Sequence, residues 1–158
     1  VTLVCRVIHT ARTVRSEEFS EYRSLETLLA EADIVSLHLP LTPQTELLIS
    51  KKSLAQMRPG AILINTARGP IVDQKALTKV LQERRIAGAG LDVLEKEPPD
   101  ADDPILKLDN VIFAPHALCW TDQCFAGIGA CDVRAVLELM QGKEPTGVVN
   151  KEVLASPA

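Results

Sequence analysis

The sequence predicts an α/β fold, a partial doubly wound parallel sheet flanked by helices. Three observations lead to this class. Short apolar runs alternate with amphipathic stretches along the chain. Hydrophobic residues make up 46% of the sequence, and its 158 residues are enough to bury the core of one ordinary domain. Because alternating strands and helices are typical of parallel sheets, we expect helices to cover both faces of the sheet.

The expected elements begin with residues 1–8, VTLVCRVI, a β-rich run. Residues 24–32, SLETLLAEA, have the spacing of a short helix, and Ser24 is placed to cap its first turn. Residues 33–39, DIVSLHL, form the next strand, which Pro40 ends. After it we expect a helix near 50–57, a strand at 61–65, a helix from about 73 to 85, strands at 87–93 and 110–114, and a helix from about 121 to 141.

The strand order raises a question about the middle of the sheet. In the usual doubly wound order, strand 1 lies between strands 2 and 4. Residues 1–8 are interpreted as strand 2 and residues 33–39 as strand 3, so strand 1 is missing from this sequence. We expect the resulting gap to close by direct pairing of strands 2 and 4, by a strand from another copy, or by an upstream piece.

Charge and composition exclude several classes of partner. The net charge of −4 and a pI near 5.4 disfavour nucleic acid and acidic membranes, which both call for a basic face. No apolar run reaches the ~20 residues of a membrane span, and no signal peptide precedes Val1. We expect a soluble, cytoplasmic protein.

The cysteines do not indicate a metal site. Cys5, Cys119, Cys124 and Cys131 contain no CxxC pair. His116 lies near two of them, but the spacing fits no structural zinc pattern. We expect reduced, mostly packed thiols and no bound metal.

Polar residues follow three successive strands. Arg68 comes after residues 61–65, Asp92 ends the next strand with Glu97 just beyond it, and His116 follows the last strand. Taken singly, each is explained as well by a surface or loop position, Arg68 for instance by a turn at the adjacent glycine. Because the carboxyl ends of parallel strands meet at one edge, their joint arrival favours a functional site.

These residue types suit hydride transfer with a proton partner. The rigid fork of Arg68 binds a carboxylate bidentately, as a 2-oxo or 2-hydroxy acid requires. His116 exchanges a proton near neutral pH, and Glu97 would favour its charged form and fix its orientation. Asp92 could accept from the amide of a nicotinamide ring.

Four blocks of the sequence point to one family. ADIVSLHLPLTPQT (32–45), INTARGPIVDQKAL (64–77), AGAGLDVLEKEP (87–98) and NVIFAPH (110–116) closely resemble the D-isomer-specific 2-hydroxyacid dehydrogenases. The resemblance implies that residues 1–150 are the C-terminal part of a Rossmann-like dinucleotide-binding domain, followed by a tail at 151–158. The glycine-rich loop and the substrate domain of that family are absent from this sequence.

The resemblance also implies roles for single residues. By it, Arg68 binds the substrate, Glu97 pairs with the histidine, and His116 is the acid–base. Residues expected to line the nicotinamide are Thr66, Ala67 and Asp92, and those expected beside the adenosine are His38, Leu39, Pro40 and Thr45. In complete members of the family, we expect a homodimer.

Three departures from the family pattern change the expectations. Leu118 and Trp120 replace small residues after the histidine, so the substrate pocket is expected to be reshaped. The second strand ends in His-Thr-Ala-Arg without a carboxylate, so Thr10 and Arg12 are expected to accept a 2′-phosphate, which slightly favours NADP over NAD. No GxGxxG loop is present, because the two GxG pairs, at 88–90 and 127–129, fall in a strand and a helix.

Two functions remain open at this point. The first is an NAD(P)-dependent oxidoreductase acting on a small 2-oxo or 2-hydroxy acid such as glyoxylate or hydroxypyruvate, with this chain inactive by itself. The second is a dinucleotide-dependent binding module similar to the C-terminal-binding protein co-repressors. Their segment after the histidine also carries a tryptophan, as Trp120 does here, and GVVNKEVL (147–154) resembles their sequence after the long helix.

Overall fold

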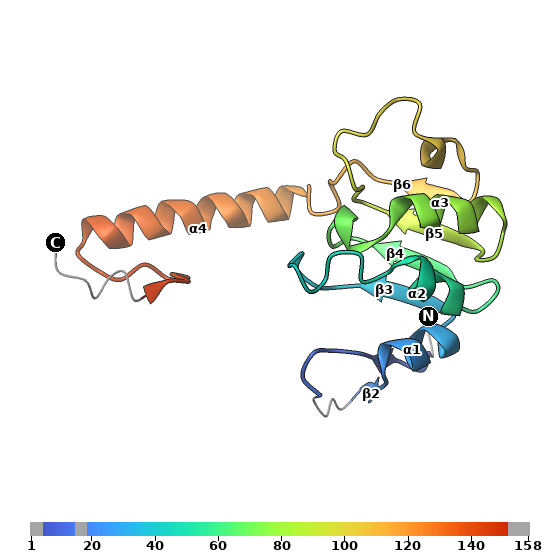
Figure 1. Ribbon diagram of the computed structural model, residues 1–158. Helices are drawn as coiled ribbons and strands as arrows, with labels where there is room; N and C mark the ends of the chain where they lie inside the picture. Colours follow the sequence, from blue (N-terminus) through green and yellow to red (C-terminus); the bar gives the residue numbers. More distant parts are fainter. Residues whose placement is uncertain (1–4, 15–18, 152–158) are drawn as a thin grey trace. The chain divides into compact units, whose positions relative to one another are not determined.

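The computed structural model describes residues 5–14 and 19–151 (Figure 1). The chain divides into two compact units, Val1–Ala117 and Leu118–Ala158, which we describe separately. The expected domain at 1–150 stays a prediction, and residues 152–158 of the expected tail lie outside the described residues.

A four-stranded parallel sheet forms the centre of the first unit, as predicted (Figure 1). Its strand order is β3-β4-β5-β6, so each strand lies beside the one that precedes it in the chain. In register, Ile34 lies opposite Ile62, and Ile62 opposite Gly88. The strands are β3 (Ile34–Leu37), β4 (Ile62–Asn65), β5 (Gly88–Leu91) and β6 (Val111–Phe113).

Three capped helices accompany this sheet: one precedes β3, one connects β3 to β4, and one connects β4 to β5. The hydroxyl of Ser24 accepts a hydrogen bond from the backbone N–H of Thr27, which confirms the predicted cap of α1. Ser50 and Asp73 cap the next two helices in the same way. The helices are α1 (Leu25–Glu31), α2 (Lys51–Gln56) and α3 (Gln74–Gln82). Short 3₁₀ turns lie before α3, at η1 (Gly69–Ile71), and before β6, at η2 (Pro104–Lys107).

Helices cover one face of this sheet, so the expectation of cover on both faces is wrong for the first unit. Val35 and Leu63 are buried in the same core as the apolar residues of α1, α2 and α3. On the opposite face, Ile34 is 62% exposed and Ile112 is 78% exposed. The cause is topological. Right-handed crossovers that step in one direction along a sheet place their helices on the same side.

A second, two-stranded parallel sheet pairs β1 (Ile8–His9) with β2 (Glu21–Tyr22). This corrects two predictions. Residues 5–7 are not in a strand, and Val1–Val4 of the expected strand lie outside the described residues. The neighbour of strand 2 is β2 and not residues 33–39, which begin the larger sheet instead. Direct pairing across the gap is not found among residues 5–14 and 19–151.

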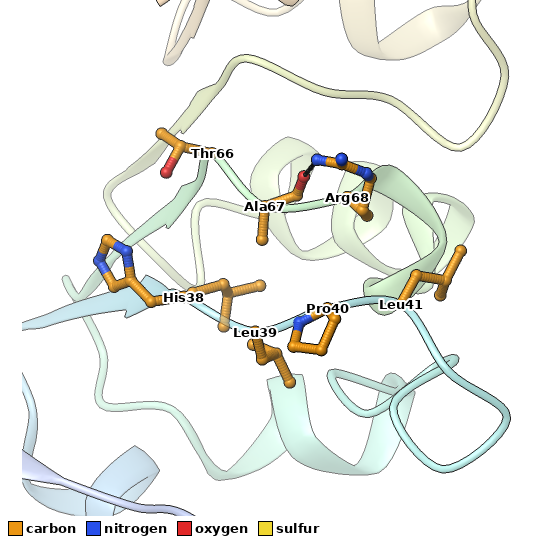
Figure 2. A pocket seen from close by; sticks show the side chains of 8 residues that line it. His38, Leu39, Pro40, Leu41, Thr66, Ala67 and Arg68 are labelled. Atoms are coloured by element: carbon orange, nitrogen blue, oxygen red, sulfur yellow. Dashed lines mark hydrogen bonds between the residues drawn. The ribbon is translucent and has the colours of Figure 1, made fainter. Parts of the chain in front are cut away.

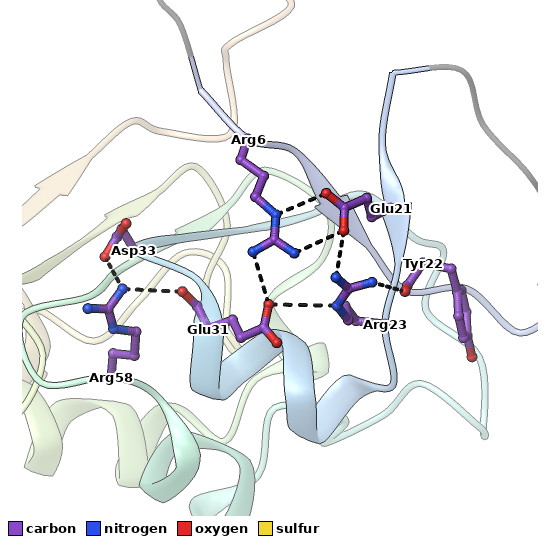
Figure 3. A network of polar contacts seen from close by, with 7 residues as sticks. All are labelled: Arg6, Glu21, Tyr22, Arg23, Glu31, Asp33 and Arg58. Carbon is purple, nitrogen blue, oxygen red and sulfur yellow. Dashed lines mark hydrogen bonds and ion pairs between the residues drawn. The ribbon is translucent and has the colours of Figure 1, made fainter.

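Ion pairs connect the small sheet to α1 (Figure 3). Glu21 lies 2.9 Å from the guanidinium of Arg6 and 2.6 Å from that of Arg23. Arg6 also reaches Glu31 at the end of α1, at 3.3 Å. The hydrogen bonds from both arginines lower the pKa of Glu21 to about 2. The network therefore holds β1 and β2 beside the first helix.

The second unit contains one long helix, α4 (Asp122–Met140), close to the predicted bounds. The hydroxyl of Thr121 caps it by accepting from the N–H of Cys124 at 3.1 Å. Its apolar residues, including Phe125 and Val136, remain exposed within the described residues. No helix in the described part of the chain is both long and apolar enough to cross a bilayer.

Candidate active site

The four polar residues predicted at the strand ends lie at the carboxyl edge of the larger sheet. Arg68 follows β4, Asp92 follows β5 directly, and His116 lies three residues beyond β6. Glu97 belongs to the loop that leaves β5. Because β4, β5 and β6 are adjacent and parallel, the loops that carry these residues share one edge.

His116 and Glu97 form a hydrogen-bonded pair. The Nδ1 atom of His116 lies 2.7 Å from Oε2 of Glu97. The other carboxylate oxygen, Oε1, accepts from the backbone N–H of Leu94 at 2.9 Å. The hydrogen bond from His116 is the main reason that the pKa of Glu97 lies below its ordinary value, with smaller contributions from the Leu94 N–H and the charge of Arg68. Glu97 is thus held as a carboxylate that orients the imidazole.

The close approach of another loop explains why a glycine, Gly69, follows Arg68. A Cβ atom at this position would lie 1.8 Å from the carbonyl oxygen of Leu94 and 2.5 Å from the nitrogen of Glu95. Only a residue without a side chain permits this approach of two backbones. The contact brings the loop that carries Arg68 against the loop that carries Glu97.

Asn65 shapes the turn before Arg68, a role that the sequence analysis missed. Its side chain is 1% exposed. The amide nitrogen donates to the carbonyl of Arg68 at 3.0 Å, and the amide oxygen accepts from the N–H of Ala67 at 3.0 Å. The available signal was a polar residue at the end of the apolar run AILIN, where a core strand would otherwise continue.

Asp92 supports the segment that follows His116. Its side chain is buried, with 7% exposure, and its Oδ1 accepts from the backbone N–H of Ala117 at 2.9 Å. Its own N–H donates to the carbonyl of Asn65 at 3.0 Å. His116, the residue before Ala117, has a φ of 53°, in the left-handed region that residues other than glycine seldom adopt.

A cavity of about 450 Å³ opens beside β3 and β4 (Figure 2). Its volume falls within the usual range for small-molecule sites. Arg68 lies at this cavity, where its Nη1 donates to the carbonyl of Ala67 at 2.6 Å. The predicted cofactor residues that line the cavity are His38, Leu39, Pro40, Thr66 and Ala67.

A second cavity, of about 280 Å³, contains the hydrogen-bonded pair of His116 and Glu97. Asp92, Glu97 and His116 line it, together with the prolines that flank the loops. The two cavities therefore divide the predicted residues: Arg68 lines the first cavity, and the three residues Asp92, Glu97 and His116 line the second.

Three predicted cofactor residues lie elsewhere. Thr45 does not line the cavity of Figure 2, and its hydroxyl donates to the carbonyl of Pro40 at 2.7 Å, so it shapes the loop. Thr10 and Arg12 follow β1 and are exposed, and the same cavity is lined without them. Trp120 and Leu118 belong to the second unit, where Trp120 contacts Phe125 with ring centroids 6.3 Å apart. The reshaped substrate pocket stays a prediction.

The residues of this edge fit the nucleoside parts of a dinucleotide. Leu39, Pro40 and Ala67 offer apolar walls in the first cavity, and Asp92 lines the second cavity. A pyrophosphate normally binds a glycine-rich loop at a helix N-terminus, and this sequence contains no such motif. The residues present therefore suit the two nucleosides of the cofactor and not the pyrophosphate between them.

Comparison with known proteins identifies a family. Residues 2–117 match the family described as "D-isomer specific 2-hydroxyacid dehydrogenase, NAD binding domain". Over 147 residues the chain is 46% identical to a glyoxylate reductase of Korarchaeum cryptofilum, covering 90% of this chain and 44% of that protein. The chain thus spans less than half the length of this relative.

Solved structures agree with the fold. A Thermus thermophilus protein superposes with a TM-score of 0.87 at 40% identity, over 91% of this chain and 46% of that one. A D-isomer specific 2-hydroxyacid dehydrogenase of Lactobacillus delbrueckii, solved with NAD, gives a TM-score of 0.83 at 37% identity, over 92% of this chain and 49% of that one.

Proposed function

Because the chain belongs to the D-isomer specific 2-hydroxyacid dehydrogenases, we propose that the complete protein transfers a hydride between a nicotinamide dinucleotide and a small 2-oxo or 2-hydroxy acid. The observation that carries the proposal is the 2.7 Å hydrogen bond between His116 and Glu97, beside Arg68. A histidine oriented by a carboxylate next to an arginine suits a carbonyl substrate that also carries a carboxylate.

In the reduction of a 2-oxo acid, the carbonyl carbon gains a hydride and the carbonyl oxygen gains a proton. The bound dinucleotide supplies the hydride. Arg68 binds the substrate carboxylate through paired N–H donors, which fixes the direction of the carbonyl. Glu97 accepts the Nδ1–H of His116, so Nε2 is the nitrogen that presents the proton to the carbonyl oxygen. The reverse reaction returns that proton to Nε2.

The cofactor is proposed to be NADP or NAD, with NADP slightly favoured. Residues 10–14, which follow β1, include exposed Thr10 and Arg12 and no acidic residue that would bind ribose hydroxyls. A guanidinium there favours the 2′-phosphate by charge. Solved relatives include one described with NADPH and one with NAD, so similarity does not decide between the two.

Glyoxylate is the proposed first substrate, with hydroxypyruvate as the second. Relatives from archaea are named glyoxylate reductases, and bacterial ones glyoxylate/hydroxypyruvate reductases. We expect the complete protein to act as a homodimer, and the 158-residue chain by itself to lack turnover, because its sequence contains no pyrophosphate-binding loop.

The experiment that tests this function measures NADPH and NADH oxidation by the complete protein with glyoxylate and with hydroxypyruvate. Arg68→Lys is expected to raise KM for either acid, because an ammonium group does not reproduce the bidentate fork. Arg84→Lys is the matched control, since Arg84 pairs with Asp109 on the surface at 2.7 Å. Equal KM values for the wild type and Arg68→Lys would contradict the role of Arg68, and absence of turnover with any 2-oxo acid would contradict the function.

A further inference from the structure

The backbone of His116 is held in an unfavourable conformation at the point where its side chain must be placed. Its φ of 53° lies in the left-handed region, where a side chain crowds the backbone. Such conformations persist only where surrounding contacts hold them, and they gather at functional sites. The structure must therefore contain contacts that stabilise the turn at His116.

Two carboxylates hold this turn from opposite sides of the residue. Glu97 contacts the side chain, through the 2.7 Å bond to Nδ1. Asp92 contacts the backbone, through the 2.9 Å bond from the N–H of Ala117 to Oδ1. A left-handed residue turns the following N–H back on the chain, and here the turned N–H meets a buried carboxylate at the end of β5.

Asp92 is itself firmly placed. Its N–H donates to the carbonyl of Asn65 at 3.0 Å, which continues the pairing of β4 and β5. The chain on the other side is fixed up to Ala114, whose N–H donates to the carbonyl of Leu91 at 3.0 Å. The segment from Pro115 to Ala117 leaves the sheet, and the bond to Asp92 ties its end back to the neighbouring strand.

We propose that Asp92 is a positioning residue that acts through the backbone: by accepting the N–H of Ala117, it keeps His116 in the left-handed conformation that directs the imidazole toward Glu97. The kinetic consequence rests on the proposed function, whereas the positioning itself does not. This role differs from the predicted contact of Asp92 with a nicotinamide amide, because its partner is a backbone N–H of the protein.

The titration of Glu97 reports the position of His116 without any activity assay. The pKa of Glu97 is lowered mainly by the hydrogen bond from His116, and the other groups that act on it are the Leu94 N–H and Arg68. Carboxyl carbon NMR of the 158-residue chain follows this pKa directly. In Asp92→Ala, we expect it to rise toward the ordinary value as the imidazole moves away. Loss of the Asp92 charge alone acts in the opposite direction, because a like charge at the same cavity disappears.

Two further variants separate the hydrogen bond from the charge. Asp92→Asn keeps an acceptor oxygen without the charge, and we expect the pKa of Glu97 to remain low in it. Asp73→Ala is the matched control, since Asp73 accepts from the N–H of Ala76 at 2.9 Å at the start of α3 and does not line the cavity that contains His116. It should leave Glu97 unchanged. A lowered pKa of Glu97 in Asp92→Ala would overturn the proposal.

A backbone variant covers the case in which Asp92→Ala does not fold. Replacing the Ala117 amide by an ester removes the N–H and leaves every side chain in place. We expect the same rise in the pKa of Glu97, and an unchanged value would overturn the proposal.

Kinetics of the complete protein test the consequence for turnover. Asp92→Ala should lower kcat by about 10²-fold, the usual effect of misplacing a reacting group by ~1 Å, with little change in KM for the acid. Asp92→Asn should lose less of kcat than Asp92→Ala, because its amide oxygen still accepts the N–H of Ala117. Absence of turnover in the wild type would count against the proposed function, while the titration would still decide the role of Asp92. Equal loss of kcat in the Asn and Ala variants would overturn positioning by the hydrogen bond.

Discussion

Gly69→Ala is the substitution that tests most sharply how the loop that carries Arg68 is joined to the loop that carries Glu97. The added Cβ would lie 1.8 Å from the carbonyl oxygen of Leu94, whereas real Cβ contacts shorter than 3.0 Å are essentially never seen. The atom in the way belongs to the backbone, so no side-chain rotation relieves the clash. The two loops must separate by more than about 1 Å, the scale on which misplacement of reacting groups becomes costly.

Separating the two loops is expected to lower both stability and turnover. Overpacking of this kind destabilises a protein by about 1–3 kcal/mol. For a chain of this size, each kcal/mol corresponds to about 2–4 °C in Tm. The peptide that must move also carries the N–H that Leu94 donates to Glu97 at 2.9 Å. We therefore expect turnover of the complete protein to fall about 10²-fold as the acid–base pair is displaced.

Calorimetry of the 158-residue chain measures the stability change, and steady-state assays of the complete protein measure turnover. Gly127→Ala is the matched control, because a Cβ at Gly127 meets no atom within 4 Å. Since alanine is favoured over glycine inside a helix, this control is expected to stabilise the chain by up to about 1 kcal/mol. If Gly69→Ala kept the wild-type Tm and turnover, the backbone contact would not join the loops as described.

Two further predictions concern charge. The folded pKa of Glu97 is lowered, so its contribution to stability is present above its ordinary pKa of 4.5 and disappears as pH falls through the folded pKa. The wild type should therefore be more stable than Glu97→Gln by less than about 1 kcal/mol at neutral pH, because the His116–Glu97 pair is partly exposed. This difference in unfolding free energy should vanish in acid, and a difference that grows in acid would contradict the lowered pKa of Glu97. Arg12→Asp should shift the ratio of kcat/KM values of the complete protein from NADPH toward NADH, and an unchanged ratio would remove Arg12 from the cofactor site.

The larger sheet could be predicted because its strands are long enough to show a pattern. AILIN and DIVSLHL are apolar runs with clear ends, and Ser24 marks the start of a helix chemically. The two-residue strand Glu21–Tyr22 has no period to detect, and without it residues 33–39 were assigned to the wrong strand position. Which face of the sheet stays exposed depends on the direction in which the crossovers step along it, and the local pattern of apolar residues does not encode that direction.

The placement of Arg68, Asp92, Glu97 and His116 at one edge could be predicted because parallel strands share a direction. What depends on tertiary contact could not be predicted. Asn65 binds a turn that exists only once the chain folds. A glycine is needed at position 69 because the backbone of Leu94, in the loop after β5, lies against it. The left-handed backbone of His116 likewise has no sequence signature.

The most direct test of the proposed chemistry is single-turnover reduction of glyoxylate by the complete protein and its His116→Gln variant, with cofactor affinity measured in parallel. Glutamine keeps a hydrogen-bonding side chain but does not exchange a proton. We predict that the rate falls by about 10²–10⁴-fold, the usual contribution of a positioned acid–base, while the cofactor Kd stays unchanged. A wild-type rate in His116→Gln would contradict the assignment of His116 as the proton donor.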